Sequence, residues 1–226
     1  MRQRRSAAGE GGLLVLFGAL AAVVAAVFAA FPAADSGTVA LLNADRRSFL
    51  DGTLQAVDRF GPLVLQAAGL LLVGATLLLR RSAAARPAAF ALLLGFIHSQ
   101  AAASVLKTLV RRDRPLERAD LAPLLRGIEA VPDVARSFPS GHVTTAAAFA
   151  AGCWLAAGAL GVSGRRRAWL CVIPIVMAWD RVALGLHHPS DAFAGIALGC
   201  AAVGFAAIGI AFATRSAEGM TVKETI

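Results

Sequence analysis

Long apolar stretches alternate with short polar segments along this chain. Six of these stretches each approach the ~20 residues that a helix needs to cross the hydrocarbon layer of a bilayer. They cover residues 12–34, 61–79, 87–106, 143–162, 168–184 and 192–214. The pattern predicts an all-α, polytopic membrane protein with six transmembrane helices in a bundle.

The composition agrees with this pattern. Hydrophobic residues make up 58% of the chain and charged residues 16%, which excludes an ordinary soluble domain. The apolar stretches are rich in Ala and Gly, and Gly195 and Gly199 are four residues apart. Such small residues let helix backbones approach closely in lipid, where packing drives helix association.

Three further segments complete the predicted organisation. Residues 36–60 mix apolar and charged positions and are too polar to span, so they predict one or two interfacial helices. Residues 1–11 and 215–226 are short polar ends. The first span also resembles a signal peptide, because basic residues precede it and small residues end it. Its apolar run is longer than a signal core, which favours a retained anchor.

The loop charges predict the orientation. Arginines cluster at the N-terminus, after the second span and after the fourth span: Arg2, Arg4, Arg5, Arg80, Arg81, Arg86, Arg165, Arg166 and Arg167. Basic loops favour the cytoplasmic side, so both termini are expected there. The Lys and Arg counts of the two faces tie at eleven each, and the orientation therefore depends on charge density in the two short loops.

The loop between the last two spans contains Arg181, His187 and Asp191 within eleven residues. Charged groups at the edge of a membrane span carry a desolvation cost, so they occur where they meet each other, water or a substrate. A histidine four residues before an aspartate can donate one ring N–H to it and keep the other nitrogen as a base or nucleophile. An alternative is an interfacial ion-pair cluster, because Pro189 and Ser190 also form a good helix start.

The loop after the third span carries a second polar cluster. Lys107 and Arg114 lie near its start, and Ser140 and Gly141 near its end. Both loops follow odd-numbered spans and therefore lie on the same face. Lys107, Arg114 and Arg181 together would provide three positive charges, which suit an anion with several oxygens such as phosphate. Ser140 and Gly141 would bring a hydroxyl and backbone N–H groups against its oxygens.

These segments resemble the tripartite signature of the type 2 phosphatidic acid phosphatase (PAP2) superfamily of membrane phosphatases. The signature reads Lys-x6-Arg-Pro, then Pro-Ser-Gly-His, then Ser-Arg-x5-His-x3-Asp. The order and spacings match in Lys107 to Pro115, Pro139 to His142, and Arg181 to Asp191. The resemblance covers about residues 40–213, with a catalytic loop at about 107–142.

The resemblance implies a role for each motif residue. His187 attacks phosphorus to give a phosphohistidine, Asp191 orients His187, and His142 acts as general acid and base. The residues that it implies for phosphate binding are Lys107, Arg114, Ser140, Gly141 and Arg181. It implies neither a metal nor another cofactor.

Three positions leave alternatives open. Asp180 stands where the signature has Ser, and it either braces Arg181 by an ion pair or weakens anion affinity. His188 neighbours His187 and competes for the nucleophile role, although His187 alone keeps the four-residue step to Asp191. The other arginines of the third-to-fourth loop are interpreted as surface or lipid-headgroup charge: Arg111, Arg112, Arg118, Arg126 and Arg136.

The predicted function is a metal-independent hydrolase of a lipid phosphate or diphosphate. Phosphatidic acid, phosphatidylglycerol phosphate, diacylglycerol pyrophosphate and undecaprenyl diphosphate are substrates of relatives with this signature. The alternatives are a lipid phosphotransferase and a non-catalytic anionic-lipid binding or transport protein. The expected partners are the lipid substrate and the bilayer, with no nucleic acid. Abundant Ala and Arg with few Lys suggest a bacterial plasma membrane, with the site facing outward.

Overall fold

The computed structural model describes residues 7–44, 48–78, 85–118, 120–125 and 136–223. Every regular element among these residues is helical, so the predicted all-α fold is confirmed. The elements are α1 (Ala7–Ala30), α2 (Pro32–Ala44), α3 (Ser48–Leu78), α4 (Arg86–Val110), η1 (Pro115–Glu117), η2 (Ala122–Leu124), α5 (Gly141–Ala159), α6 (Gly164–Arg167), η3 (Ala168–Cys171), α7 (Val172–Ala183) and α8 (Pro189–Lys223).

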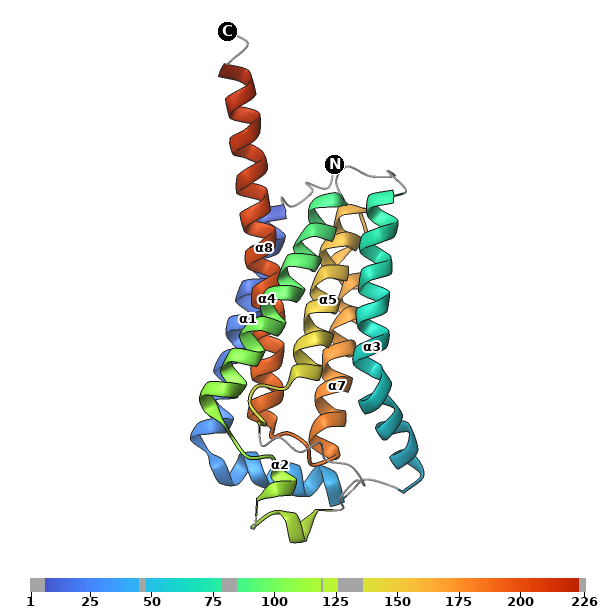
Figure 1. The fold of residues 1–226 in the computed structure, drawn as a ribbon, viewed down its shortest axis with the longest axis vertical. Helices are drawn as coiled ribbons and strands as arrows, with labels where there is room; N and C mark the ends of the chain where they lie inside the picture. The colour runs from blue at the N-terminus through green and yellow to red at the C-terminus, as the bar shows by residue number, and fades with distance from the viewer. Residues whose placement is uncertain (1–6, 45–47, 79–84, 119, 126–135, 224–226) are drawn as a thin grey trace.

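The long helices form a bundle, and α2 lies across one end of it (Figure 1). The helix α8 packs against α1, α4 and α5, and α5 also contacts α3 and α7. The start of α1 and the end of α8 lie at the end of the bundle opposite α2, where α8 extends beyond the other helices (Figure 1). The two ends of the bundle are therefore distinct.

The contact between α5 and α8 depends on small residues. A Cβ atom at Gly195 would lie 2.7 Å from the carbonyl oxygen of Ser140, and one at Gly199 would lie 2.7 Å from that of Thr144. Real Cβ atoms do not approach backbone oxygens so closely. The two glycines therefore allow the close approach of helix backbones that their spacing predicts.

Many large apolar side chains are exposed on the outer faces of the bundle, including Leu16, Leu20, Leu70, Leu71 and Phe205. Four of the described helical segments are long and apolar enough to cross a membrane: Ala7–Ala30, Asp51–Thr76, Arg86–Glu117 and Pro189–Ser216. Helices with apolar outer faces suit a lipid environment, in which all backbone groups must pair within the protein.

The other two expected spans differ from the prediction. The fourth corresponds to α5, which has 19 residues and is largely buried within the bundle. The fifth, residues 168–184, is divided into η3 and the 12-residue α7. Pro174 stands near the start of α7, where its missing N–H leaves no helical bond unmade. Four segments of the described residues thus meet the criteria of length and composition for a span, fewer than the six expected.

The expected boundaries also shift. Residues 32–34 belong to α2 rather than to the first span, and α8 continues beyond residue 214 to Lys223. The interfacial interpretation of residues 36–60 fits α2 alone. Residues 48–60 form the first turns of α3, which continues through Pro62 into the second expected span.

Basic residues lie at the end of the bundle opposite α2. Arg86 begins α4, and Arg165, Arg166 and Arg167 lie in α6. The other arginines of the orientation argument, in residues 1–6 and 79–84, lie outside the described residues.

Candidate active site

The three predicted motifs meet at the end of the bundle that α2 crosses. Lys107 lies in the last turn of α4, and His142 in the first turn of α5. Arg181 lies near the end of α7, and Asp191 in the first turn of α8. The loop between α7 and α8 carries His187. Five separate segments thus contribute to one site, because helices that alternate in direction bring every second loop to the same end.

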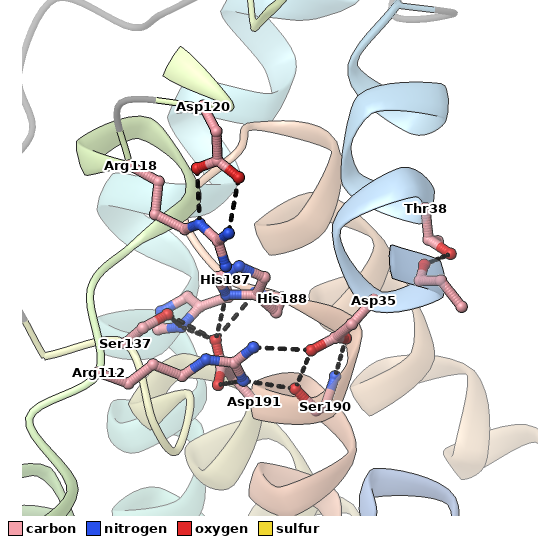
Figure 2. Close-up of polar contacts among 11 residues, drawn as sticks. Asp35, Thr38, Arg112, Arg118, Asp120, Ser137, His187, His188, Ser190 and Asp191 are labelled. Carbon is pink, nitrogen blue, oxygen red and sulfur yellow. Dashed lines mark hydrogen bonds and ion pairs between the residues drawn. The ribbon is translucent and has the colours of Figure 1, made fainter. Parts of the chain in front are cut away.

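His187 is buried, and its Nδ1 atom faces Asp191 through a serine. The distance from His187 Nδ1 to Asp191 Oδ2 is 3.9 Å, too long for a direct hydrogen bond. Ser137 Oγ lies 3.4 Å from His187 Nδ1 and donates to Asp191 Oδ2 at 2.5 Å (Figure 2). Ser137 therefore connects the predicted nucleophile to its predicted orienting carboxylate, and Nε2 of His187 is the ring nitrogen left for chemistry.

Burial sets the protonation state of His187. Desolvation is the largest cause and lowers the pKa of His187 to about 3, with Arg181 and Lys107 acting in the same direction and Asp191 in the opposite one. A neutral imidazole at ordinary pH retains a lone pair, which a nucleophile requires.

His188 lies closer to Asp191 than His187 does. Its backbone N–H donates to Asp191 Oδ2 at 2.8 Å, and its Nδ1 lies 3.3 Å from the same oxygen. The Nε2 atom of His188 is buried and has no hydrogen-bond partner among the described residues. The distance to Asp191 alone thus does not separate the two histidines as nucleophile candidates.

Arg112 holds the other oxygen of Asp191. Its Nη1 donates to Asp191 Oδ1 at 2.8 Å and to Ser190 Oγ at 2.6 Å, and its Nη2 donates to Asp35 Oδ2 at 2.8 Å (Figure 2). The interpretation of Arg112 as surface charge is therefore wrong, because its guanidinium lies between two buried carboxylates.

Arg181 and His142 meet at one acidic residue of α3. Arg181 Nη1 donates to the carboxylate of Asp58. His142 Nε2 lies 3.0 Å from the Asp58 carbonyl oxygen and 3.3 Å from its Oδ1 atom. By contrast, Asp180 Oδ2 lies 3.9 Å from Arg181 Nε, and both Asp180 oxygens are buried with no hydrogen-bond partner in the described part of the chain. Asp58, rather than Asp180, is the close partner of Arg181.

Several donors at this end make no hydrogen bond to the described part of the chain. Arg114 Nε, Ser140 Oγ and Arg181 Nε are buried without a hydrogen-bond partner among the residues that the structure describes. Buried polar groups are normally paired, and each exception calls for an explanation. Ser140 lies beside α8, because its N–H donates to the Asp191 carbonyl oxygen at 3.0 Å. A ligand with several acceptor oxygens would satisfy these donors.

Two more predicted residues lie at the same end. Lys107 Nζ donates to the carbonyl oxygen of Arg136 at 2.9 Å. Gly141 begins α5, and a Cβ atom there would lie 3.8 Å from Lys107 Cε. Lys107 also lies within electrostatic reach of Arg114, Asp191 and Arg181.

The sequence argument missed Asp35, Asp58 and Ser137, and it gave Arg112 a different role. One signal was available for the carboxylates: both lie among apolar residues in the segment 36–60 or just before it, on the face of the predicted odd-numbered loops. Ser137 had no such signal, because a single serine in a loop is ordinary.

The comparisons with known proteins agree with the motifs. A family model described as the PAP2 superfamily matches residues 88–215, starting later than the expected residue 40. Decaprenylphosphoryl-5-phosphoribose phosphatase from Mycobacterium tuberculosis is 32% identical over 177 residues, which cover 74% of this chain and 86% of the relative.

Two solved structures have a similar fold. The transmembrane PAP2 type phosphatidylglycerolphosphate phosphatase from Bacillus subtilis aligns with a TM-score of 0.65 and 21% identity, covering 88% of this chain and 94% of its own. LpxE from Aquifex aeolicus aligns with a TM-score of 0.55 and 21% identity, covering 76% and 92%.

The fold and the site define a multi-pass helical membrane protein with histidines, cations and carboxylates gathered at one end. The family match extends over more than half of the chain, and this chain belongs to the PAP2 superfamily. The expected enzyme class, a membrane phosphatase, is confirmed by the family and by the relative. These matches favour catalysis over the binding or transport alternative.

Proposed function

We propose that this protein hydrolyses a lipid phosphate or diphosphate through a phosphohistidine on His187. The observation that carries the proposal is the set of buried donors on Arg114, Ser140 and Arg181 that make no hydrogen bond to the described residues, next to the histidine loop. Together with Lys107 and the Gly141 backbone, these donors suit the negatively charged oxygens of a phosphoryl group. Neutral His187 supplies the nucleophile beside them.

In the first step, Nε2 of His187 attacks phosphorus, and the bond from phosphorus to the lipid oxygen breaks. His142 gives its proton to that oxygen, a contribution of roughly 10²–10⁴ in rate. Asp191 and Ser137 hold the Nδ1 side of His187, which fixes the ring and favours the charge that develops on it.

In the second step, a water oxygen attacks phosphorus, and the bond from phosphorus to His187 breaks. His142 now takes the proton of the water, so phosphate leaves and both histidines return to their starting states. Lys107, Arg114 and Arg181 stabilise the negative charge on the equatorial oxygens in both steps, as metal ions do in many phosphoryl-transfer enzymes. We therefore propose a metal-independent reaction.

The substrate class is a phosphorylated membrane lipid. The relative that shares 32% identity is a phosphatase of a decaprenyl-linked phosphoribose, which makes phosphorylated polyprenyl lipids the first candidates. Phosphatidic acid, phosphatidylglycerol phosphate and undecaprenyl diphosphate are the next ones.

The proposed arrangement in the membrane has six spans, with α5 and α7 crossing inside the bundle. Residues 12–214 form the membrane domain, with residues 1–11 and 215–226 as cytoplasmic ends. The site then opens at the outer face of a bacterial plasma membrane. The α6 arginines at the opposite end support this orientation, because basic residues favour the cytoplasmic side.

The test is release of inorganic phosphate by purified protein in detergent, with EDTA present, from a panel of these lipids. Wild type is compared with His187→Ala, His188→Ala and His142→Ala. We expect EDTA-resistant release that His187→Ala abolishes and that His188→Ala retains.

Two results would contradict the proposal. Full activity of His187→Ala would exclude His187 as the nucleophile. Loss of activity in His188→Ala alone would assign the nucleophile role to His188. Tight lipid binding with no release from any substrate would restore the binding or transport interpretation.

A further inference from the structure

We infer that Asp35 and Arg112 are positioning residues that hold Asp191 in the orientation that the His187 reaction requires. The inference rests on the proposed function, and it adds α2 to the active centre. It begins from a network of four residues, named here the α2–α8 bridge: Asp35, Arg112, Ser190 and Asp191.

The two oxygens of Asp191 bind different partners, and Arg112 binds one of them. Oδ1 accepts from Arg112 Nη1 at 2.8 Å, whereas Oδ2 accepts from Ser137 and from the backbone of His188. A carboxylate fixed at Oδ1 cannot rotate away from the histidine loop. Hydrogen bonds between charged groups are shorter and stronger than neutral ones, so this contact is a firm hold.

Asp35 holds the bridge from α2. Its carboxylate is fully buried, and both of its oxygens are used. Oδ1 accepts from the Ser190 N–H at 3.0 Å, and Oδ2 accepts from Ser190 Oγ at 2.5 Å and from Arg112 Nη2 at 2.8 Å. An acidic group at the start of a helix is favourable, because the N–H groups there are unpaired. Asp35 thus fixes both the guanidinium that holds Asp191 and the helix turn that carries it.

The charges make the bridge interdependent. One guanidinium lies between two carboxylates that are both 0% exposed. Without Arg112, the buried carboxylates of Asp35 and Asp191 would lose the guanidinium that lies between them, and this is strongly unfavourable. The Asp35 carboxylate therefore stabilises the orientation of Asp191 while Arg112 is present, and it destabilises that orientation once Arg112 is removed.

The experiment measures kcat and KM for phosphate release from dioctanoyl phosphatidic acid by Asp35→Asn, Arg112→Gln, Arg112→Lys and the double variant Asp35→Asn/Arg112→Gln. We expect kcat to fall about 10²-fold in Arg112→Gln, because small misplacements of catalytic groups have effects of this size. KM stays within about twofold, since neither residue is assigned to phosphate. Arg112→Lys recovers part of kcat, because it restores the charge but not the forked geometry.

The double variant separates positioning from simple destabilisation. Asp35→Asn alone lowers kcat about tenfold, yet in the Arg112→Gln background it raises kcat, because it removes one of two facing charges. Destabilising changes would instead multiply their losses. The control is Arg111→Gln, which removes an equal charge from an exposed neighbour. The Arg111 side chain donates to the Thr108 carbonyl oxygen in α4, and the change should keep wild-type kcat.

The outcomes separate this inference from the proposed function. Loss of activity in His187→Ala, together with wild-type kcat in Asp35→Asn and Arg112→Gln, overturns the inference alone. Undiminished activity in His187→Ala overturns the proposed function. If Arg112→Gln does not fold, Asp35→Asn and Arg112→Lys still test the positioning role. A rise in KM without a fall in kcat in these two variants contradicts that role.

Discussion

At the scale of single residues, Arg181 is bound by an acidic group of the protein itself. Its Nη1 donates to the Asp58 carboxylate, which also lies 3.3 Å from His142 Nε2. Arg181 and His142 both have roles in the proposed reaction. A phosphate group that approaches Arg181 must compete with Asp58, because two anions then share one guanidinium.

This competition predicts the effect of Asp58→Asn. The amide keeps the shape of the side chain and loses the charge, so inorganic phosphate should inhibit the enzyme about tenfold more tightly, the equivalent of one charged hydrogen bond. The measurement is the inhibition constant of phosphate in the release assay. Asp113→Asn, an exposed change at the same end, is the control. Unchanged or weaker inhibition would mean that Asp58 supports phosphate binding.

The buried His187 predicts a pH dependence of stability. Burial lowers the pKa of His187 to about 3, whereas an unfolded histidine titrates near about 6.5. The unfolded chain therefore takes up a proton first as the pH falls. The stability that neutral His187 contributes is fully present above about pH 6.5 and is lost as the pH falls from there toward 3.

The check is the thermal unfolding midpoint in detergent between pH 4 and pH 7.5, for wild type and His187→Asn. Wild type should lose stability more steeply with acid than the variant, because only wild type carries the buried imidazole. Parallel curves would contradict a depressed pKa. Because folded His187 stays neutral between pH 4 and pH 7.5, its protonation should not lower the activity in this range.

At the scale of elements, the close contact of α5 and α8 positions Ser140 beside Asp191. A Cβ atom at Gly195 would lie 2.7 Å from the Ser140 carbonyl oxygen and 3.2 Å from the Thr144 nitrogen. Both atoms belong to the backbone and cannot move aside alone. The same two helices carry the phosphate serine and the orienting carboxylate of the proposed site.

Gly195→Ala should therefore separate the two helices and lower kcat/KM by about 10²-fold, with a lower unfolding temperature. The control is Gly209→Ala on the same helix, where a Cβ atom would meet nothing within 4 Å. That change should leave activity intact and should not lower stability, since Ala is the better helix former by about 1 kcal/mol. Equal behaviour of the two variants would contradict a packing role for Gly195.

The sequence predicts the positions of the helices better than it predicts their lengths. Apolar runs predict where α1, α4 and α8 lie, because lipid exposure requires about 20 apolar residues in each. They do not predict that residues 48–60 extend α3 or that α7 is short. Those lengths depend on contacts with neighbouring helices, and α7 packs against α2, α3 and α5 inside the bundle.

The same limit applies to the site. The motif spacings are local, and they bring Lys107, His142, His187 and Asp191 to one end of the bundle. Asp35 and Asp58 act through contacts with residues 77 and 123 positions away. No spacing rule links such distant positions, so only the fold identifies them as partners.

At the scale of the whole molecule, the bundle has two chemically different ends. The end crossed by α2 holds His142, His187, His188 and the α2–α8 bridge. The other end holds an ion pair in which Arg167 of α6 bonds Glu10 of α1 at 3.0 Å, and Arg167 also lies over the Trp154 ring. This pair fixes α1 to α5 and α6 at the end where α8 leaves the bundle (Figure 1).

If the bundle spans the membrane as proposed, these two ends face opposite compartments. Gly37 in α2 and Gly164 in α6 are exposed, and a Cβ atom at either would meet nothing within 4 Å. Each can therefore be changed to cysteine with little strain, after Cys153, Cys171 and Cys200 have been replaced by alanine. A membrane-impermeant maleimide then reports which end is outside.

In intact cells, Gly37→Cys should react and Gly164→Cys should react only after permeabilisation. This result follows from basic residues at the α6 end, which favour the cytoplasm, and it gives outer-leaflet lipids access to the site. The reverse pattern would invert the orientation and direct the enzyme to inner-leaflet substrates. Labelling of both positions in intact cells would contradict the proposed crossing of the bilayer by α5 and α7, because these two helices connect the histidine end to α6.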